Sequence, residues 1–144
     1  AKPMSSETPE ILITFPGGKR VNADFFGRII ETDQSRRAGG DGSAPEPFAL
    51  FLASIGTCAG IYVLGFLQSR GMSGEGVQIR QALHFDSSGV VNGIDLNIDL
   101  PDTVPAKYHE AIRRSADMCT VKKVIQSQPT FRVNVNAKGE VAAA

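Results

Sequence analysis

The stretch that decides the fold runs from Pro47 to Ser69 and reads PFALFLASIGTCAGIYVLGFLQS. It contains no charged residue, and Cys58 stands at its centre. Proline is favoured at the first position of a helix, and glycine is favoured just after the last one. Pro47 and the Arg70-Gly71 pair therefore mark the two ends, and the stretch is predicted to form one long helix with Cys58 in its middle.

Two environments suit such an apolar helix. Its length allows a membrane span, and Gly56 and Gly60 form a G-x-x-x-G motif, which pairs helices in membranes. However, Ser54, Thr57 and Gln68 interrupt the apolar run, and no basic cluster flanks it. We therefore expect no membrane span but a core helix that the rest of the domain covers on nearly all sides.

Length and composition limit the possible classes of protein. The chain has 144 residues, so we expect a single domain over residues 1–144, with a loose N-terminus at residues 1–9. Fifteen basic residues balance fifteen acidic ones, which does not favour binding to nucleic acid or an anionic membrane. No secretory signal is visible, which predicts a cytoplasmic protein. Two cysteines are too few for a disulfide scaffold.

The segments around the long helix read as strands, loops and a second helix. Before it, residues 11–15 end at a Pro-Gly-Gly turn, residues 21–32 form one or two strands that turn near Gly27, and residues 36–43 form a glycine-rich connection. After it, residues 77–85 and 94–100 alternate apolar and polar side chains around a Ser-Ser-Gly turn. Residues 105–126 have helical spacing, with Tyr108, Ile112, Ser115 and Cys119 on one stripe, and residues 131–135 alternate again. This order predicts an α+β fold with an antiparallel sheet.

Cys58 and Cys119 are expected to face the same core from two helices. Free cysteine often packs as a small hydrophobic residue, so inert packing and redox chemistry both remain open from the pattern alone. Redox chemistry requires a thiolate, and burial in apolar surroundings raises the pKa of a thiol. Cys58 sits several turns from the positive end of its own helix, so a cation from elsewhere is expected to activate it. The candidates upstream are Arg20, Arg28, Arg36 and Arg37.

The surface around Cys58 suits an apolar substrate, and it suits ordinary core packing equally well. At helical spacing from Cys58 lie Phe51, Ser54, Ile55, Ile61 and Tyr62. The two histidines, His84 and His109, do not fall at a metal-ligand spacing with the cysteines, so neither a metal nor a cofactor is expected.

The run APEPFALFLASIGTCAGIYVLGFLQSRG, from Ala44 to Gly71, resembles the central-helix signature of the OsmC-like family, which includes the organic hydroperoxide resistance proteins. A second family element, a cysteine followed by a small residue and valine, is similar to Cys119-Thr120-Val121. The segments Thr32-Asp33-Gln34 and Gly39-Gly40-Asp41 also resemble the family's approach to the helix. The likeness spans roughly residues 11–136.

The resemblance implies an OsmC-like fold in which the sheet wraps around the central helices of an intertwined homodimer, with the active sites at the subunit interface. It also implies reduction of organic hydroperoxides, with Cys58 as the peroxidatic and Cys119 as the resolving cysteine. An external dithiol would then reduce the disulfide. The family's strand arginine matches Arg20 best and Arg28 second, and the substrate face would include Phe51, Ile55 and Tyr62.

One position departs from the family pattern. The family's peroxidases commonly carry a glutamate nine or ten residues before the peroxidatic cysteine, where this chain has Ala49 and Phe48. Either Glu46, the nearest acid, takes that role from just outside the helix, or the arginine is tuned in a different way. The departure leaves a second hypothesis, a non-enzymatic module that binds a small apolar ligand in the same pocket and whose cysteines only pack.

Overall fold

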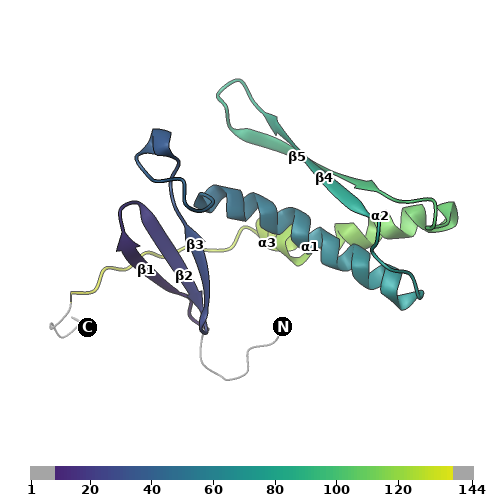
Figure 1. Ribbon diagram of the computed structural model, residues 1–144, viewed down its shortest axis with the longest axis horizontal. Helices are drawn as coiled ribbons and strands as arrows, with labels where there is room; N and C mark the ends of the chain where they lie inside the picture. The colour runs from purple at the N-terminus through teal and green to yellow at the C-terminus, as the bar shows by residue number, and fades with distance from the viewer. Residues whose placement is uncertain (1–8, 138–144) are drawn as a thin grey trace. The chain divides into compact units, whose positions relative to one another are not determined.

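The structure is a computed structural model that describes residues 9–137, so the expected loose N-terminus, residues 1–9, lies outside it except for Pro9. Strands and helices follow one another in the order β1 (Leu12–Gly17), β2 (Arg20–Phe25), β3 (Arg28–Thr32), the 3-10 turn η1 (Arg36–Ala38), α1 (Pro47–Ser69), β4 (Gln78–Phe85), β5 (Val91–Asp99), the 3-10 turn η2 (Ala106–Tyr108), α2 (His109–Asp117) and α3 (Thr120–Ser127). Figure 1 shows these elements. The α+β class and the bounds of the long helix are confirmed.

The chain forms two compact units, Ala1–Thr57 and Cys58–Ala144, and the boundary between them falls within α1. The first unit holds a three-stranded antiparallel sheet in the order β1-β2-β3. Gly17 and Gly18, at the first turn, and Gly27, at the second, all have positive φ, a conformation that glycine adopts at no steric cost. Residues 21–32 therefore form two strands that turn near Gly27, as the sequence predicts.

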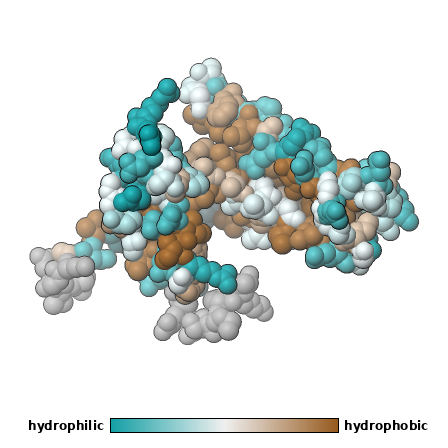
Figure 2. Space-filling model, in the orientation of Figure 1, coloured by the Kyte–Doolittle hydropathy of each residue, from teal (hydrophilic) through white to brown (hydrophobic). Residues whose placement is uncertain are grey.

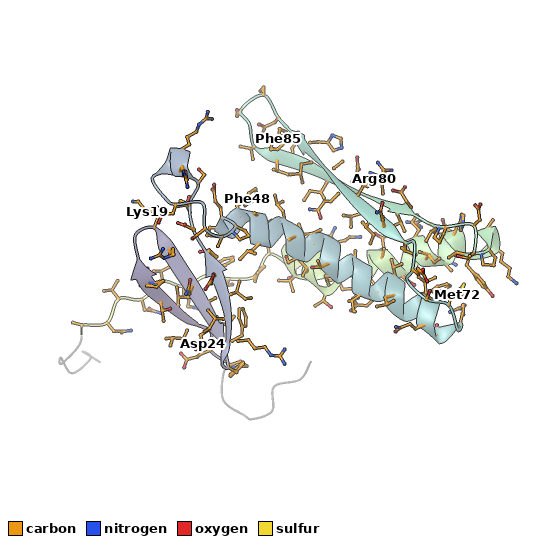
Figure 3. The ribbon with its side chains drawn as sticks, viewed as in Figure 1. Lys19, Asp24, Phe48, Met72, Arg80 and Phe85 are labelled. Carbon is orange, nitrogen blue, oxygen red and sulfur yellow. The ribbon has the colours of Figure 1, made fainter. Side chains whose placement is uncertain are left out.

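In the second unit, β4 and β5 form an antiparallel hairpin, as predicted, and β5 reaches back to Val91. Ile79 and Leu83 on its apolar face are half-buried, whereas Phe85 near the turn is exposed. On the opposite face, Arg80 pairs with Asp99 at 2.6 Å, and Arg80 is labelled in Figure 3. The hairpin thus has one face for the core and one for solvent.

The core of the second unit lies between α1, α2 and the hairpin. Ala59, Val63 and Leu67 recur every four residues on α1 and form one buried stripe. Val104, Cys119 and, from α2, Ile112 and Ala116 belong to the same cluster, and apolar side chains of β4 and β5 pack against it. Figure 1 shows the hairpin, α2 and α3 alongside this part of α1.

Three expectations about these elements are wrong within the described residues. The segment 105–126 is not one helix, because it breaks between α2 and α3 at Met118 and Cys119. The expected strand at residues 131–135 has no regular structure, and its apolar side chains are 87–95% exposed, because no strand of the described chain pairs with it. Helix α1 is covered on one face rather than on nearly all sides.

Helix α1 leaves much of its apolar surface exposed. Only 22% of its most apolar window is buried, although the helix is long and apolar enough to span a membrane by length and composition alone. Core helices of soluble proteins are often as long and as apolar. Ile61, for example, lies opposite the buried stripe and is 62% exposed. Hydrophobic residues are also open on the face of the molecule shown in Figure 2.

Candidate functional site: two cysteines at a helix terminus

Cys58 and Cys119 lie together in the second unit, although they are far apart in the sequence. Cys58 is half-buried on α1, beside the buried stripe. Cys119 is 1% exposed and stands at the N-cap of α3, with extended backbone angles (φ −50°, ψ 125°). The two side chains share a hydrogen bond, and no disulfide joins them. The tertiary fold therefore brings the two candidate redox residues into contact.

The N-terminus of α3 meets the sulfur of Cys58. The backbone N–H groups of Val121 and Thr120 form hydrogen bonds with this sulfur. These groups belong to the first turn of a helix, where N–H groups have no partner inside the helix and carry partial positive charge. The hydrogen bond from Val121 is the main cause that lowers the pKa of Cys58, and the Cys119 thiol and Thr120 lower it further against the opposing effect of desolvation.

The same contact has the opposite effect on Cys119. Burial raises the pKa of its thiol, and the neighbouring Cys58 raises it further. A thiol with a raised pKa stays protonated and donates its hydrogen bond to the neighbour that ionises first. Of the two thiols, Cys58 is therefore the one that ionises first, and Cys119 is the one that keeps its proton longer.

The sequence analysis did not anticipate this source of positive partial charge at Cys58, and the expected cation from elsewhere stays a prediction. The positive end of α1 is indeed several turns away, but α3 supplies its own N-terminus instead. The sequence gives little sign of a second helix start at Thr120, because the apolar spacing from Tyr108 runs on to Cys119, which lies in the break between α2 and α3. A cysteine at an N-cap has no distinctive pattern either, since serine, threonine, aspartate and asparagine dominate there.

The remaining residues predicted to activate Cys58 belong to the first unit. Arg20 lies on β2, and its Nη1 atom is 3.7 Å from Oδ2 of Asp41. Arg28 is the exposed first residue of β3. Glu46 is exposed just before α1, and its backbone carbonyl accepts hydrogen bonds from Ala49 and Leu50 at the start of the helix.

Sequence reasoning gave no role of its own to one acid of the first unit, Asp33. Its side chain is 1% exposed and accepts hydrogen bonds from the backbone N–H groups of Gln34, Asp41 and Ser43 and from the Ser43 hydroxyl, the last at 2.6 Å. These bonds, led by that of the hydroxyl, lower the pKa of Asp33 to about 2. Asp33 thereby fixes the loop that carries Asp41, the partner of Arg20.

The predicted substrate face lies along α1 but is not uniform. Phe51 is 43% exposed and stacks on Phe48, with ring centroids 5.7 Å apart. Ile55 is buried. Tyr62 is half-buried, and its hydroxyl lies 2.9 Å from Oγ1 of Thr120. Phe48 is labelled in Figure 3 near the start of the helix.

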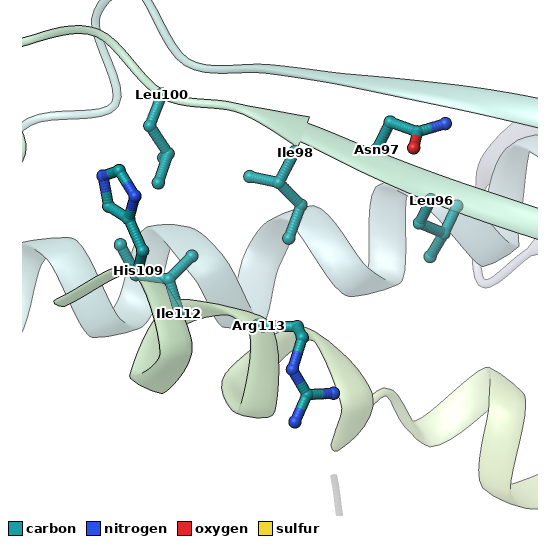
Figure 4. A pocket seen from close by; sticks show the side chains of 7 residues that line it. All are labelled: Leu96, Asn97, Ile98, Leu100, His109, Ile112 and Arg113. Atoms are coloured by element: carbon teal, nitrogen blue, oxygen red, sulfur yellow. The ribbon is translucent and has the colours of Figure 1, made fainter. Parts of the chain in front are cut away.

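A cavity of about 290 Å³ lies elsewhere in the second unit, between β5 and α2. Leu96, Ile98 and Ile112 supply apolar walls, and His109 and Arg113 stand at its rim (Figure 4). Arg113 is already paired with the carboxylates of Glu110 and Asp117, at 2.6 and 3.2 Å. Neither cysteine lines this cavity. The candidate site is the cysteine pair, because its two thiols are in contact and their pKa values are shifted.

The chain matches one family model and is similar to solved structures. The family model for OsmC-like proteins matches residues 40–134, which include both cysteines. No curated protein matches. A protein from Psychrobacter arcticus 273-4, named for osmotic stress induction and a detoxification response, is 19% identical and superimposes with a TM-score of 0.68, over 83% of this chain and 89% of that one. An organic hydroperoxide resistance protein OsmC from Legionella pneumophila is 18% identical, with a TM-score of 0.49, over 85% and 91% of the two chains.

The first of these structures shares the fold, with its antiparallel sheets and long helix. The family match extends over well more than half of the chain and includes the central helix and the Cys119-Thr120-Val121 element. On this evidence the chain belongs to the family of OsmC-like proteins.

Proposed function

We propose that this protein is a thiol peroxidase that reduces organic hydroperoxides, with Cys58 as the peroxidatic and Cys119 as the resolving cysteine. The single observation that carries the proposal is the contact between the two thiols, in which the pKa of Cys58 is lowered and that of Cys119 is raised. Membership of the OsmC-like family supports it. A pair of cysteines that only packed would need neither the contact with α3 nor opposite shifts of pKa.

The reaction divides into three balanced steps. The Cys58 thiolate attacks the terminal oxygen of the hydroperoxide, the O–O bond breaks, and the alkoxide takes up a proton and leaves as an alcohol. Cys58 is now a sulfenic acid. The Cys119 thiol condenses with it to a disulfide and releases water. An external dithiol then reduces the disulfide by thiol–disulfide exchange and is itself oxidised.

The other residues that we propose to act in the reaction include an arginine and a glutamate of the first unit. Arg20, or Arg28 in its place, would approach the thiolate and polarise the peroxide, and Glu46 would orient that arginine. Within the first unit, Arg20 pairs with Asp41 on the loop that Asp33 organises. Phe51, Ile55 and Tyr62 would line the site for the alkyl group, so bulky apolar hydroperoxides would react faster than hydrogen peroxide.

A homodimer belongs to the same proposal. The uncovered apolar face of α1 around Ile61 and the alternating, exposed segment at residues 131–135 both support it. Burial of such surfaces against a second copy would remove apolar area from water and give the segment strand partners. We also propose that the protein works in the cytoplasm, where an external dithiol is available to reduce it.

The decisive experiment mixes fully reduced protein with one equivalent of cumene hydroperoxide, then counts free thiols and measures the intact mass. The proposal requires that both thiols are lost, that the mass falls by two hydrogens, and that the reaction is faster than with hydrogen peroxide. Cys58→Ser should consume no peroxide. Thiols that stay unchanged over minutes would contradict the proposal and favour the module that binds an apolar ligand.

A further inference from the structure

Tyr62 and Thr120 connect α1 to the start of α3 next to the reactive sulfur. Tyr62 follows Cys58 by four residues, so the two side chains project from the same face of α1, one turn apart. Thr120 is the first residue of α3 and directly follows Cys119. Their hydroxyl oxygens lie 2.9 Å apart, a normal hydrogen-bond distance. This bond joins the two elements that the site is built from.

Several contacts hold the N-terminus of α3 in place. The helix has eight residues, none of them buried, and Lys122 in its first turn pairs with Asp117 at 2.6 Å. Val121 packs against the core cluster, and Cys119 belongs to it. Short helices depend on tertiary contacts for their position. The orientation of the first turn therefore depends on the packing of Cys119 and Val121, on the Lys122–Asp117 ion pair and on the Tyr62–Thr120 hydrogen bond.

We propose that Tyr62 is a positioning residue of this site: its hydroxyl holds Thr120, and with it the first turn of α3, against the sulfur of Cys58. The N–H groups of Thr120 and Val121, which form hydrogen bonds with that sulfur, move with the backbone that the Tyr62 hydroxyl restrains. This inference rests on the proposed function, because the alignment matters only where Cys58 works as a thiolate. In this role the Tyr62 hydroxyl binds Thr120 of α3 and not the substrate.

The Tyr62–Thr120 hydrogen bond is exposed. Its effect on the position of α3 can therefore be distinguished from an effect on the stability of the whole fold. Exposed hydrogen bonds contribute little to the free energy of unfolding, because water replaces them in the unfolded chain. The loss of the Tyr62 hydroxyl should therefore leave the melting temperature nearly unchanged. It should weaken the stabilisation of the thiolate instead, because the first turn of α3 would no longer be held in line with Cys58.

The test measures the rate of iodoacetamide alkylation of Cys58 against pH, with the modified residue identified by peptide mass spectrometry. In Tyr62→Phe the midpoint should rise by about half a unit to one unit, the equivalent of one hydrogen bond. The rate below the midpoint should then fall about three- to tenfold, and the deficit should disappear at high pH. A merely structural defect would not recover with pH.

Matched variants distinguish the hydroxyl from the ring. Thr120→Val removes the partner hydroxyl and should produce the same shift, whereas Thr120→Ser should restore the wild-type midpoint. The double variant should shift no further than either single variant, because both remove the same bond. Tyr108→Phe removes the hydroxyl of the chain's other tyrosine and should leave the midpoint unchanged.

The outcomes separate the two proposals. A wild-type midpoint at or above about 8.5 would contradict the working thiolate and therefore both of them. A low wild-type midpoint that neither Tyr62→Phe nor Thr120→Val raises would overturn the positioning role of Tyr62 and leave the proposed function standing. If Tyr62→Phe failed to fold, Thr120→Val would decide the matter alone.

Discussion

The thiols of Cys58 and Cys119 share one hydrogen bond, yet the fold changes their pKa values in opposite directions. Cys58 receives N–H groups from the first turn of α3, and its pKa is lowered. Cys119 caps the same turn from a buried position, and its pKa is raised. The N–H groups of α3 at Cys58 and the burial of Cys119 therefore separate the pKa values of two chemically identical side chains.

The contribution of the Cys119 thiol to this difference can be measured. In Cys119→Ala the hydrogen bond to Cys58 is lost, and the alkylation midpoint of Cys58 should rise by about half a unit to one unit. Cys119→Ser is the matched control, because its hydroxyl can still donate, and its midpoint should stay close to that of the wild type. The pH profile of iodoacetamide alkylation provides both values. Equal midpoints in Cys119→Ala and the wild type would argue against the hydrogen bond.

The Cys119→Ser variant also tests the resolving role. It should react with one equivalent of cumene hydroperoxide at Cys58 and then stop at the sulfenic acid, because no second thiol is present in the chain to condense with it. Intact mass spectrometry should show the gain of one oxygen, and dimedone should label Cys58. Steady turnover with a dithiol reductant should fall at least tenfold. An unlabelled Cys58 after peroxide treatment would rule out the first step of the mechanism.

The buried carboxylate of Asp33 should support the loop that carries Asp41. Asp33→Asn keeps the size of the side chain but removes its charge, so the backbone N–H groups of Asp41 and Ser43 lose a charged acceptor. We expect the melting temperature at pH 7 to fall by several degrees. Glu31→Gln is the matched control, since Glu31 is exposed on β3, and it should change the melting temperature little.

Acid titration should show the same contribution with a defined sign. The pKa of Asp33 is about 2 in the folded chain and 3.8 in its ordinary state. A lowered folded pKa stabilises the protein fully above the ordinary value, and this stabilisation is lost as the pH falls from 3.8 towards 2. Asp33→Asn should therefore differ from the wild type at pH 7, and the difference should shrink below pH 3.8. Thermal melts across this range would refute the assignment if the difference stayed constant.

The buried stripe of α1 and its exposed face should respond differently to truncation. Leu67 is 0% exposed, so Leu67→Ala should lower the free energy of unfolding by about 2–5 kcal/mol. Ile61→Ala on the exposed face should lower it by about 0.5 kcal/mol or less in the isolated chain. Urea titration measures both values. If a second copy covers Ile61, as proposed, this variant should instead shift the oligomeric state towards monomer in sedimentation experiments.

Much of the local structure was predictable, because local chemistry sets it. Pro47 and Gly71 mark the ends of α1, and alternation with a Ser-Ser-Gly turn marks the hairpin β4–β5. The predicted second helix was only partly right, because the apolar spacing from Tyr108 to Cys119 continues through the break between α2 and α3. A break in a helix loses few hydrogen bonds, and the N–H groups of Thr120 and Val121 that it leaves without helical partners form hydrogen bonds with Cys58.

The sequence by itself determined the α+β class, the long apolar helix with Cys58 at its centre, and the candidate pair of cysteines. These features depend on periodicity and on turn and cap residues, which act between neighbours along the chain. Only the tertiary structure decided that Cys119 caps α3, that the first turn of α3 faces Cys58, and that Tyr62 reaches Thr120. The pKa of a thiol depends on groups that folding brings within hydrogen-bond distance, and residues 62 and 120 approach each other only when the core packs.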